Sequence, residues 1–447
     1  MRRFGHDLLR VVLQNMPQYS SITNPKRHLN PLEAEARKLF PYYAGFSESF
    51  VESVLGVLDL APESVILDQW NGSGTTTSTA LKCGFNVVGS DLNPAMIIVA
   101  KAALVSVLDL KSLLPLAVSI VKKAERLKID FDSDPLFHWF DSASSSNIRR
   151  VEESINSTLI SHATYVPLNT SEGLEKLTPL SAFFYLALFR VVRRLTANFV
   201  ASNPTWIKVS KSSEERKYVP KEEVFGLFIK EVEQLSVHQA ISPRDRDLNL
   251  DQVQLILSDA KNLPLSENSV DAILTSPPYC TRIDYAVATY VELAVIRVGG
   301  QKFAQLRRDL TGSSTVPRTG SEERVEWGET CLEFLDKVKN HRSKASGTYY
   351  LKSHIQYFDS LYNSVAEAAR VLKHGAPFVL VVQNSYYKEV RNDVALIIEE
   401  MARHVGLGLN YHADFVAARS MVDLNKKSKV YIKKRQTVES VLVLEKN

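Results

Sequence analysis

The sequence has few of the features that mark membrane, metal-binding or disulfide-stabilised proteins. Its apolar runs, such as residues 379–382, are short, and all of them fall far below the ~20 residues that span a bilayer. The three cysteines stand far apart and show no paired spacing, so we expect neither a disulfide framework nor a Cys/His metal site: they are Cys83, Cys280 and Cys331.

The first residues also lack the features of a secretory leader. Arg2 and Arg3 precede a short apolar stretch at residues 8–13, but Arg10 interrupts it and no small-residue cleavage site follows. We therefore expect a cytoplasmic protein with no membrane segment.

Neither charge sign is in large excess. The chain has 54 Lys and Arg against 50 Asp and Glu, a net charge of +4, which permits a nucleic-acid partner without requiring one. With 447 residues, 45% apolar and 23% charged, it has a globular composition and enough length for two to three domains at roughly 150 residues each. Glycine is scarce at 18 residues, so closely spaced glycines are informative.

Strand and helix patterns alternate between residues 64 and 110. The apolar runs 65–67 and 86–90 are each followed by a helical pattern, and Asn93-Pro94 is typical of a helix start. Such a pattern predicts parallel strands joined by right-handed crossovers. Further strand patterns follow at residues 253–257, 270–274, 378–382, 411–418 and 437–444. We therefore expect an α/β protein with a Rossmann-like, mostly parallel sheet, a C-terminal antiparallel hairpin and helical inserts.

Polar, helical segments interrupt this alternation and suggest three parts. Residues 1–110 hold an N-terminal segment and the first half of the sheet domain. Residues 111–250 form a helical insert with a serine-rich link at 142–146, and residues 251–447 form the second half, with a smaller insert at about 296–352.

A glycine-containing turn lies between the first predicted strand and helix: Asp68-Gln-Trp-Asn-Gly72-Ser73-Gly74-Thr75-Thr76. Glycines let the backbone approach a ligand closely, and a helix start offers free N–H groups. The turn lacks both the Gly-Lys-Ser/Thr of a Walker loop and the third glycine of the dinucleotide fingerprint. Asp91 ends the next strand, where acidic residues accept hydrogen bonds from ribose hydroxyls. Together these features predict a nucleoside-bearing cofactor without a pyrophosphate, although a glycine pair alone also suits a plain tight turn.

The motif Ser276-Pro277-Pro278-Tyr279 comes shortly after the strand predicted at 270–274. Two prolines fix φ at successive positions and supply no ladder N–H, so the loop is rigid. The hydroxyl before them and the ring after them form a platform for a planar amine. Ligands of α/β sheets bind at the carboxyl ends of strands, which favours a functional loop over a merely stiff one.

These two motifs, in this order, resemble those of S-adenosylmethionine-dependent DNA amino-methyltransferases. That family typically has Asp-Pro-Phe-x-Gly-Ser-Gly-Thr-Thr and then Asp/Asn/Ser-Pro-Pro-Tyr/Phe, and serine in the first catalytic position resembles the subset that methylates the N4 amine of cytosine. This chain departs at Gln69 and Trp70, neither of which removes the turn. Phe40-Pro-Tyr-Tyr-Ala-Gly-Phe46 is similar to the segment over the methionine end of the cofactor, and Ser258-Asp259-Ala260 to the acidic turn at the adenine amine.

The resemblance covers roughly residues 38–108, 250–298 and 352–447, and it implies S-adenosylmethionine as cofactor. The implied cofactor-binding residues are Phe46, Asp68, Gly72, Ser73, Gly74, Thr75, Thr76, Asp91, Asp259 and Ala260, and the implied catalytic residues are Ser276, Pro277, Pro278 and Tyr279. On the family's pattern, the Ser276 hydroxyl and the Pro277 carbonyl accept from the amine N–H groups and Tyr279 stacks on the base.

The implied substrate is duplex DNA with a flipped cytosine, and a cognate restriction nuclease is a candidate partner. A carbon-5 mechanism is disfavoured because the chain has no Pro-Cys dipeptide, and Cys280 is expected to be a packed loop residue. Related enzymes methylate guanine N2 or cytosine N4 in RNA, or glutamine in proteins, and a non-catalytic nucleic-acid-binding module is a further alternative.

Three basic stretches are candidate phosphate contacts. They are the helix face formed by Arg190, Arg193 and Arg194, the segment 302–308, and the segment 426–435. A solvated helix surface is the alternative for each. Target recognition is expected in the inserts, with the first and larger insert preferred.

Overall fold

The computed structural model describes residues 17–26, 40, 45–241, 248–280, 283–313, 315, 322–416 and 437–447. Its strands are β1 (Val65–Asp68), β2 (Asn86–Asp91), β3 (Val253–Leu257), β4 (Ala272–Thr275), β5 (Pro377–Gln383), β6 (Ser385–Tyr387), β7 (Val390–Asn392), β8 (Leu407–Val416) and β9 (Val438–Lys446). Its α-helices are α3 (Glu48–Leu55), α4 (Thr75–Lys82), α5 (Pro94–Ala102), α6 (Leu110–Arg126), α7 (Ser142–Leu159), α8 (Ser171–Glu175), α9 (Pro179–Leu195), α10 (Lys221–Ile241), α11 (Tyr285–Ala288), α12 (Tyr290–Val295), α13 (Gly300–Asp309), α14 (Glu329–Lys339), α15 (Leu351–Val371) and α16 (Val394–His404).

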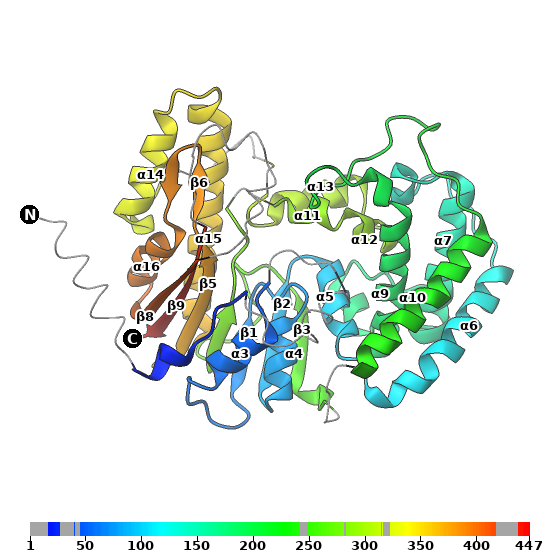
Figure 1. The fold of residues 1–447 in the computed structure, drawn as a ribbon, viewed down its shortest axis with the longest axis horizontal. Coiled ribbons are helices and arrows are strands. Elements are labelled where there is room, and N and C mark those ends of the chain that lie inside the picture. The colour runs from blue at the N-terminus through cyan, green and yellow to red at the C-terminus, as the bar shows by residue number, and fades with distance from the viewer. Residues whose placement is uncertain are drawn as a thin grey trace, which may run out of the picture.

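Seven strands form one mixed sheet in the order β3-β2-β1-β4-β5-β9-β8 (Figure 1). The first five are parallel to one another, and β9 runs antiparallel between β5 and β8. The expected Rossmann-like α/β fold, with a mostly parallel sheet, a C-terminal antiparallel hairpin and helical inserts, is therefore confirmed. The chain order reverses at β1, which has β2 on one side and β4 on the other, and such a switch point is where open α/β sheets bind ligands.

Side chains alternate between the two faces of the sheet, as the period of a strand requires. Ile66, Ala272 and Val379 lie in a core with α3 and α4, whereas Leu67, Ile273 and Phe378 lie in a second core with α14, α15 and α16. Both faces of the central strands are covered, which explains their near-continuous apolar sequences.

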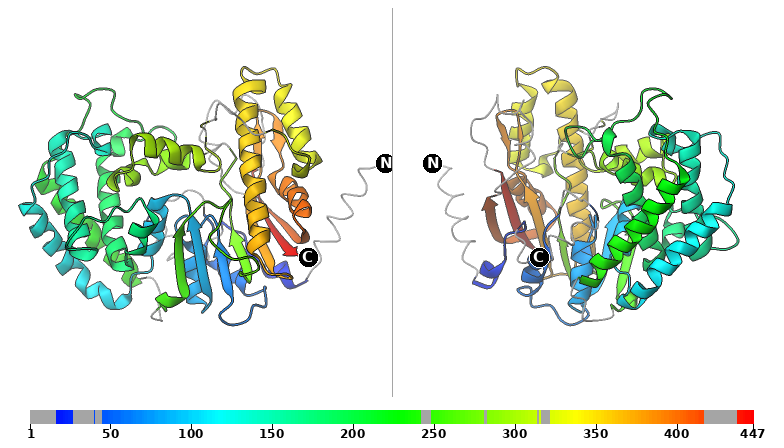
Figure 2. Two further views of the ribbon diagram at one scale, coloured as in Figure 1. Left: turned by 180° about the vertical axis from the view of Figure 1, so that it is seen from behind. Right: turned by 45° about the vertical axis from the view of Figure 1, so that its right-hand side comes forward.

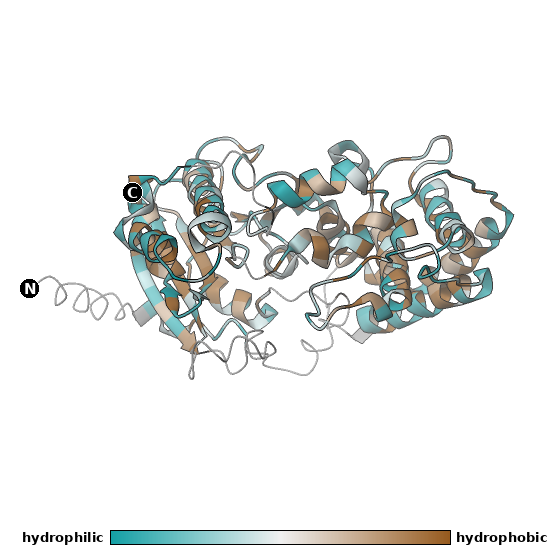
Figure 3. Cartoon of the chain, turned by 90° about the horizontal axis from the view of Figure 1, so that it is seen from above, coloured by the Kyte–Doolittle hydropathy of each residue, from teal (hydrophilic) through white to brown (hydrophobic). Residues whose placement is uncertain are grey.

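A third core joins the large insert to the rest of the molecule. It combines α5 and α12 with the insert helices α6, α7, α9 and α10. The insert lies beside the β3 edge of the sheet (Figure 1), and its helices carry both hydrophobic and hydrophilic residues in the hydropathy colouring of Figure 3. The insert therefore packs on the sheet domain through a continuous apolar interior.

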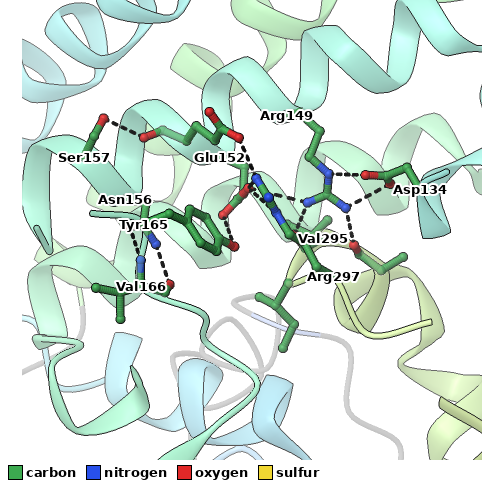
Figure 4. A network of polar contacts seen from close by, with 12 residues as sticks. Asp134, Arg149, Glu152, Asn156, Ser157, Tyr165, Val166, Val295 and Arg297 are labelled. Carbon is green, nitrogen blue, oxygen red and sulfur yellow. Dashed lines mark hydrogen bonds and ion pairs between the residues drawn. The ribbon is translucent and has the colours of Figure 1, made fainter. Parts of the chain in front are cut away.

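A buried polar network fixes the insert to α12 (Figure 4). Arg149 of α7 is only 1% exposed, pairs with Asp134 at 2.7 Å and donates to the carbonyls of Ala294 and Val295. Arg297 pairs with the buried Glu152 at 2.9 Å. Separating such a buried ion pair would leave a charge that is neither paired nor solvated, which is energetically costly. These contacts therefore hold the insert in one orientation.

Two local expectations were wrong. Residues 142–146 are the first turn of α7 rather than a link, because Asp141 caps the helix by accepting from the Ser144 N–H at 2.8 Å. The strand expected at 270–274 is β4, Ala272–Thr275, because Val270 pairs only in an isolated bridge with Leu372.

Within the described residues, no single helix has the length and apolarity needed to cross a membrane. The segments Pro94–Ala102 and Val107–Arg126 reach that length and composition only as a pair, which bends by 79°.

Candidate functional site

A cavity opens at the carboxyl ends of β1, β2 and β4, at the switch point of the sheet. It encloses about 900 Å³, including space that opens to solvent. Its lining residues are Gly45, Phe46, Asp68, Gln69, Trp70, Asn71, Ser73, Thr75, Thr76, Asp91, Leu92, Asn93, Met96, Asp259, Ala260, Ser276, Pro277, Pro278, Tyr285, Thr289, Asp309, Leu310 and Thr311. The helices α11 to α13 lie above the sheet between the insert and α15 (Figure 2), and the last five lining residues belong to α11, to α13 or to the residues that directly follow these two helices.

The glycine turn has the backbone that its sequence requires. Gly72 and Gly74 have φ of 49° and 84°, in the left-handed region that favours glycine. A Cβ on Gly74 would also come within 2.9 Å of the Ala100 Cβ, so α4 and α5 approach each other closely there. The turn thereby brings the first N–H groups of α4 to the cavity, where they suit a polar or anionic ligand.

Asp68 at the end of β1 is a buried carboxylate without a cationic partner in the described contacts. Its Oδ1 accepts from the Thr275 hydroxyl at 2.5 Å and from the Trp70 N–H at 3.1 Å. Burial raises the pKa of Asp68 to about 6, although the hydrogen bonds oppose the shift. A carboxylate kept charged at such cost is more easily explained by ligand binding than by stability.

Asp91 at the end of β2 holds the glycine turn in place. Its Oδ2 accepts from the Gly72 N–H at 2.9 Å and its Oδ1 from the Asn93 N–H at 2.8 Å. Burial also raises the pKa of Asp91 to about 6. Because each carboxylate oxygen has a second lone pair, Asp91 can still accept from ligand hydroxyls.

Two buried polar atoms beside the turn have no hydrogen-bond partner among the described residues. They are Nδ2 of Asn71 and Oε1 of Gln69, and both side chains line the cavity. Buried donors and acceptors normally have hydrogen-bond partners, so a polar ligand in this cavity would supply the partners that these two atoms lack. The glycine turn, the two carboxylates and these orphaned atoms suit a nucleoside-bearing cofactor.

The acidic turn after β3 closes the far end of the cavity. Asp259 and Ala260 line it, and the Asp259 carboxylate accepts from the Lys261 N–H at 3.0 Å. On the opposite side Phe46 is buried and its ring lies 5.2 Å from Phe50 of α3. Thus polar and aromatic groups from distant segments meet at one cavity.

The Ser276 hydroxyl has a defined orientation. It donates to the carbonyl of Val381 on the neighbouring strand β5 at 2.8 Å. With its proton held there, the oxygen presents its lone pairs to other donors. Ser276 and Pro277 line the cavity, so this acceptor adjoins the space for a cofactor.

The rest of the loop that contains Ser276 to Tyr279 is braced by three other parts of the chain. Tyr357 of α15 donates to the Pro278 carbonyl at 3.0 Å, and the Tyr279 N–H donates to the Tyr285 hydroxyl at 3.2 Å. Lys26 reaches both the Gly45 carbonyl, at 2.7 Å, and the Tyr279 hydroxyl, at 3.4 Å. The loop that bears the two prolines is therefore held by elements that are far apart in sequence.

The structure brings eleven of the fourteen sequence-predicted residues to the cavity wall. Gly72 and Gly74 shape the turn behind the wall, and Tyr279 lies outside the lining, next to Lys26. Sequence reasoning missed the neighbours Gln69 to Asn71, although they belong to the same motif. It also missed Tyr285, Thr289 and residues 309–311, which lie beyond the catalytic motif and carried no recognisable signal.

The basic surfaces differ from expectation. Arg190 and Arg194 both pair with the buried Glu231, at 2.7 and 2.5 Å, and Arg193 pairs with the buried Glu292 at 2.6 Å. Arg190 and Arg194 therefore join α9 to α10 within the insert, and Arg193 joins the insert to α12, although Arg194 keeps 42% of its side chain exposed. Residues 426–435 lie outside the described residues.

The described part of the chain contains no group of three or more His, Cys, Asp or Glu placed to hold a metal ion.

The chain is similar to curated proteins named as type II methyltransferases, whereas no protein-family model matches it. It is 32% identical over 162 residues to type II methyltransferase M.AvaI of Nostoc sp. (strain PCC 7120 / SAG 25.82 / UTEX 2576), over 33% of each chain, and equally to M.AvaI of Anabaena variabilis. It is 24% identical over 283 residues to type II methyltransferase M.BsoBI of Geobacillus stearothermophilus, over 60% of this chain and 54% of that one. The chain thus spans about a third of the M.AvaI proteins and about half of M.BsoBI.

Proposed function

We propose that this protein transfers a methyl group from S-adenosylmethionine to the exocyclic N4 amine of cytosine in duplex DNA. The observation that carries the proposal is the Ser276 hydroxyl, whose proton is held by the Val381 carbonyl at the edge of a cavity suited to a nucleoside. The names of the relatives support DNA modification, and the serine in the catalytic motif supports cytosine.

The cavity residues have complementary roles toward the cofactor. Asp91 would accept from the ribose hydroxyls, Asp259 and Ala260 would meet the adenine, and Asp68, Phe46 and the glycine turn would surround the methionine end. When bound, S-adenosylmethionine supplies an activated methyl group on a sulfonium. The chain therefore needs no nucleophile of its own, which agrees with the burial of Cys280 in the apolar core.

The chemical difficulty lies in the amine, whose lone pair is delocalised into the pyrimidine ring. Ser276 Oγ would accept from one amine N–H, and the Pro277 carbonyl would accept from the other. Two acceptors placed out of the ring plane favour a pyramidal nitrogen with its lone pair free for in-line attack. Because the proton of Ser276 is already committed to Val381, the hydroxyl cannot instead donate to the amine nitrogen and mask that lone pair.

Tyr279 would stack on the flipped base. Its backbone N–H donates to the Tyr285 hydroxyl, and its own hydroxyl accepts from Lys26. These contacts at both ends of the residue restrict rotation of the ring. A ring already in place offsets part of the free energy, a few kcal/mol, that it costs to unstack the base from the duplex.

A cognate restriction nuclease is the expected functional partner.

The experiment is to compare Ser276→Ala with the wild type on unmethylated phage DNA. We expect a loss of transfer of roughly 100-fold or more, comparable with removing one group that stabilises a transition state. Binding of S-adenosylhomocysteine, measured by calorimetry, is expected to stay within about twofold, since Ser276 faces the amine. Ser236→Ala is the control, because its hydroxyl makes a local bond on the exposed side of α10. Unchanged transfer by Ser276→Ala would refute the site.

A further inference from the structure

We propose that aromatic and basic side chains from both inserts form a single duplex DNA-binding rim beside the cavity. The rim cluster consists of Trp206 from the first insert, Arg307 from α13, and Tyr349 and Tyr350 from the π-helical turn η7 (Ser346–Tyr350) before α15. The choice of DNA as ligand rests on the proposed function. The rim draws on both inserts, whereas the sequence favoured the first and larger insert as the site of target recognition.

Arg307 is the centre of the cluster. Its guanidinium lies 5.7 Å from the centre of the Trp206 ring, within the range of a cation–π contact. Its Nε also donates to Asp284 at 2.7 Å. Gln356 of α15 donates to the Arg308 carbonyl at 3.4 Å, so α13 contacts the helix that directly follows η7, where the Tyr349 and Tyr350 rings lie 5.1 Å apart.

The cluster is joined directly to the cavity. Asp284 caps α11, whose first residue, Tyr285, lines the cavity. Two residues after Arg307, the segment 309–311 forms another part of the cavity wall. A Cβ on the following Gly312 would come within 2.9 Å of the Tyr279 carbonyl, so this segment rests against the catalytic loop. A ligand on the rim would therefore lie next to the base-binding loop.

The aromatic rings of the rim are exposed on a braced support. Trp206, Tyr349 and Tyr350 are 39%, 42% and 36% exposed, whereas most large apolar side chains among the described residues are buried. A hydrogen bond of 2.6 Å between Ser346 Oγ and the hydroxyl of the buried Tyr387 anchors the turn that carries the two tyrosines. Rigid, exposed aromatic rings beside an arginine suit stacking on bases that are unstacked next to a flipped nucleotide.

The charge around the rim suits a polyanion. Residues 340–358 carry Arg342, Lys344 and Lys352, all exposed, and contain no Asp or Glu, although the whole chain has a net charge of only +4. Further exposed cations lie on the other two segments at Lys208, Lys211, Lys302 and Arg308. Glu214 and Glu215 are the exposed acids of the first-insert loop. The excess of cations predicts phosphate contacts on both sides of the aromatic rings.

The test measures DNA affinity without requiring methyl transfer. The probe is a fluorescein-labelled duplex DNA pool of randomised sequence, bound in the presence of S-adenosylhomocysteine. Trp206→Ala and Tyr349→Ala are each expected to weaken binding about tenfold, as the loss of stacking on a base displaced from the duplex predicts. Trp206→Phe retains a ring and is expected to stay within about threefold of the wild type.

The salt dependence tests the cations separately. Lys344→Gln is expected to lower the slope of log affinity against log salt by about 0.9, the value for one phosphate contact. Lys122→Gln, on the exposed side of α6 in the distant part of the insert, is the matched control and is expected to leave the slope unchanged. Calorimetry with S-adenosylhomocysteine checks that every variant keeps the cofactor site.

The outcomes separate this inference from the proposed function. If methylated cytosine is absent but the rim variants still weaken DNA binding, the rim stands and the reaction is wrong. If methylated cytosine is found while the rim variants bind and methylate DNA as the wild type does, the rim is wrong and the reaction stands. Tighter binding of a structured RNA pool, with the same loss in the variants, would overturn DNA as the ligand.

Discussion

Replacing Asp68 with asparagine separates the effect of this carboxylate on stability from its role in ligand binding. Burial raises the pKa of Asp68 from its ordinary 3.8 to about 6. The folded state therefore holds a proton between these pH values that the unfolded chain releases. As pH rises through this window the wild type loses stability, because the charged form is disfavoured in the fold.

The magnitude follows from the size of the shift. About two pH units at about 1.36 kcal/mol each correspond to about 3 kcal/mol near neutral pH, as an upper bound. Asparagine has nearly the same shape, keeps an Oδ1 for the Thr275 hydroxyl and the Trp70 N–H, and carries no charge. We therefore expect Asp68→Asn to be more stable than the wild type above about pH 6, and the difference to vanish toward pH 4.

The assay is urea unfolding across this pH range, paired with calorimetry of S-adenosylhomocysteine binding. We expect the variant to gain stability while it loses at least tenfold in affinity. Asp271→Asn is the matched control, because that half-exposed carboxylate contacts the Val65 N–H and Lys373 at the other end of the strands. A variant that is less stable than the wild type and binds the cofactor normally would refute the role assigned to Asp68.

Three further perturbations test other parts of the molecule. Gly74→Ala is expected to lower both stability and cofactor binding by more than Gly84→Ala. Both glycines have positive φ, but only a Cβ at position 74 would clash with Ala100. Thermal melts of the two variants compare their stabilities directly. Burial alone would lower the pKa of His412, but hydrogen bonds to Asp414 and Glu399 raise it to about 9. His412→Gln is therefore expected to lose up to about 3 kcal/mol relative to the wild type below pH 6.5, and this difference is expected to disappear as pH rises through 9 in urea titrations. Tyr357→Phe is expected to lower the turnover number about tenfold with little change in cofactor affinity, because it removes the hydrogen bond to the Pro278 carbonyl. An unchanged turnover number would contradict the role of this hydrogen bond in positioning the loop.

Local sequence signals were sufficient to predict much of the sheet. The turn chemistry around Gly72 and Gly74 set the end of β1 and the start of α4, and Asn93-Pro94 set the start of α5. Each of these signals acts within a few residues, so no knowledge of the rest of the chain was needed.

Contacts across long sequence distances could not be predicted. The arginines of α9 show a helical face in the sequence, but their partners Glu231 and Glu292 lie 41 and 99 positions away from Arg190 and Arg193. Residues 309–311 and Lys26 likewise reach the site only through tertiary packing. The serine-rich stretch at 142–146 was misread because serine suits both a link and a helix start, and the Asp141 cap decides between them.

The most direct test of the central claim is identification of the methylated nucleoside. Purified protein is incubated with methyl-labelled S-adenosylmethionine and unmethylated duplex DNA, or separately with total RNA, and the digested nucleosides are analysed by mass spectrometry. The account predicts N4-methyldeoxycytidine in the DNA, absent when Ser276 is replaced with alanine. Methyl label at carbon 5 of cytosine, at adenine N6, or in RNA alone would contradict it.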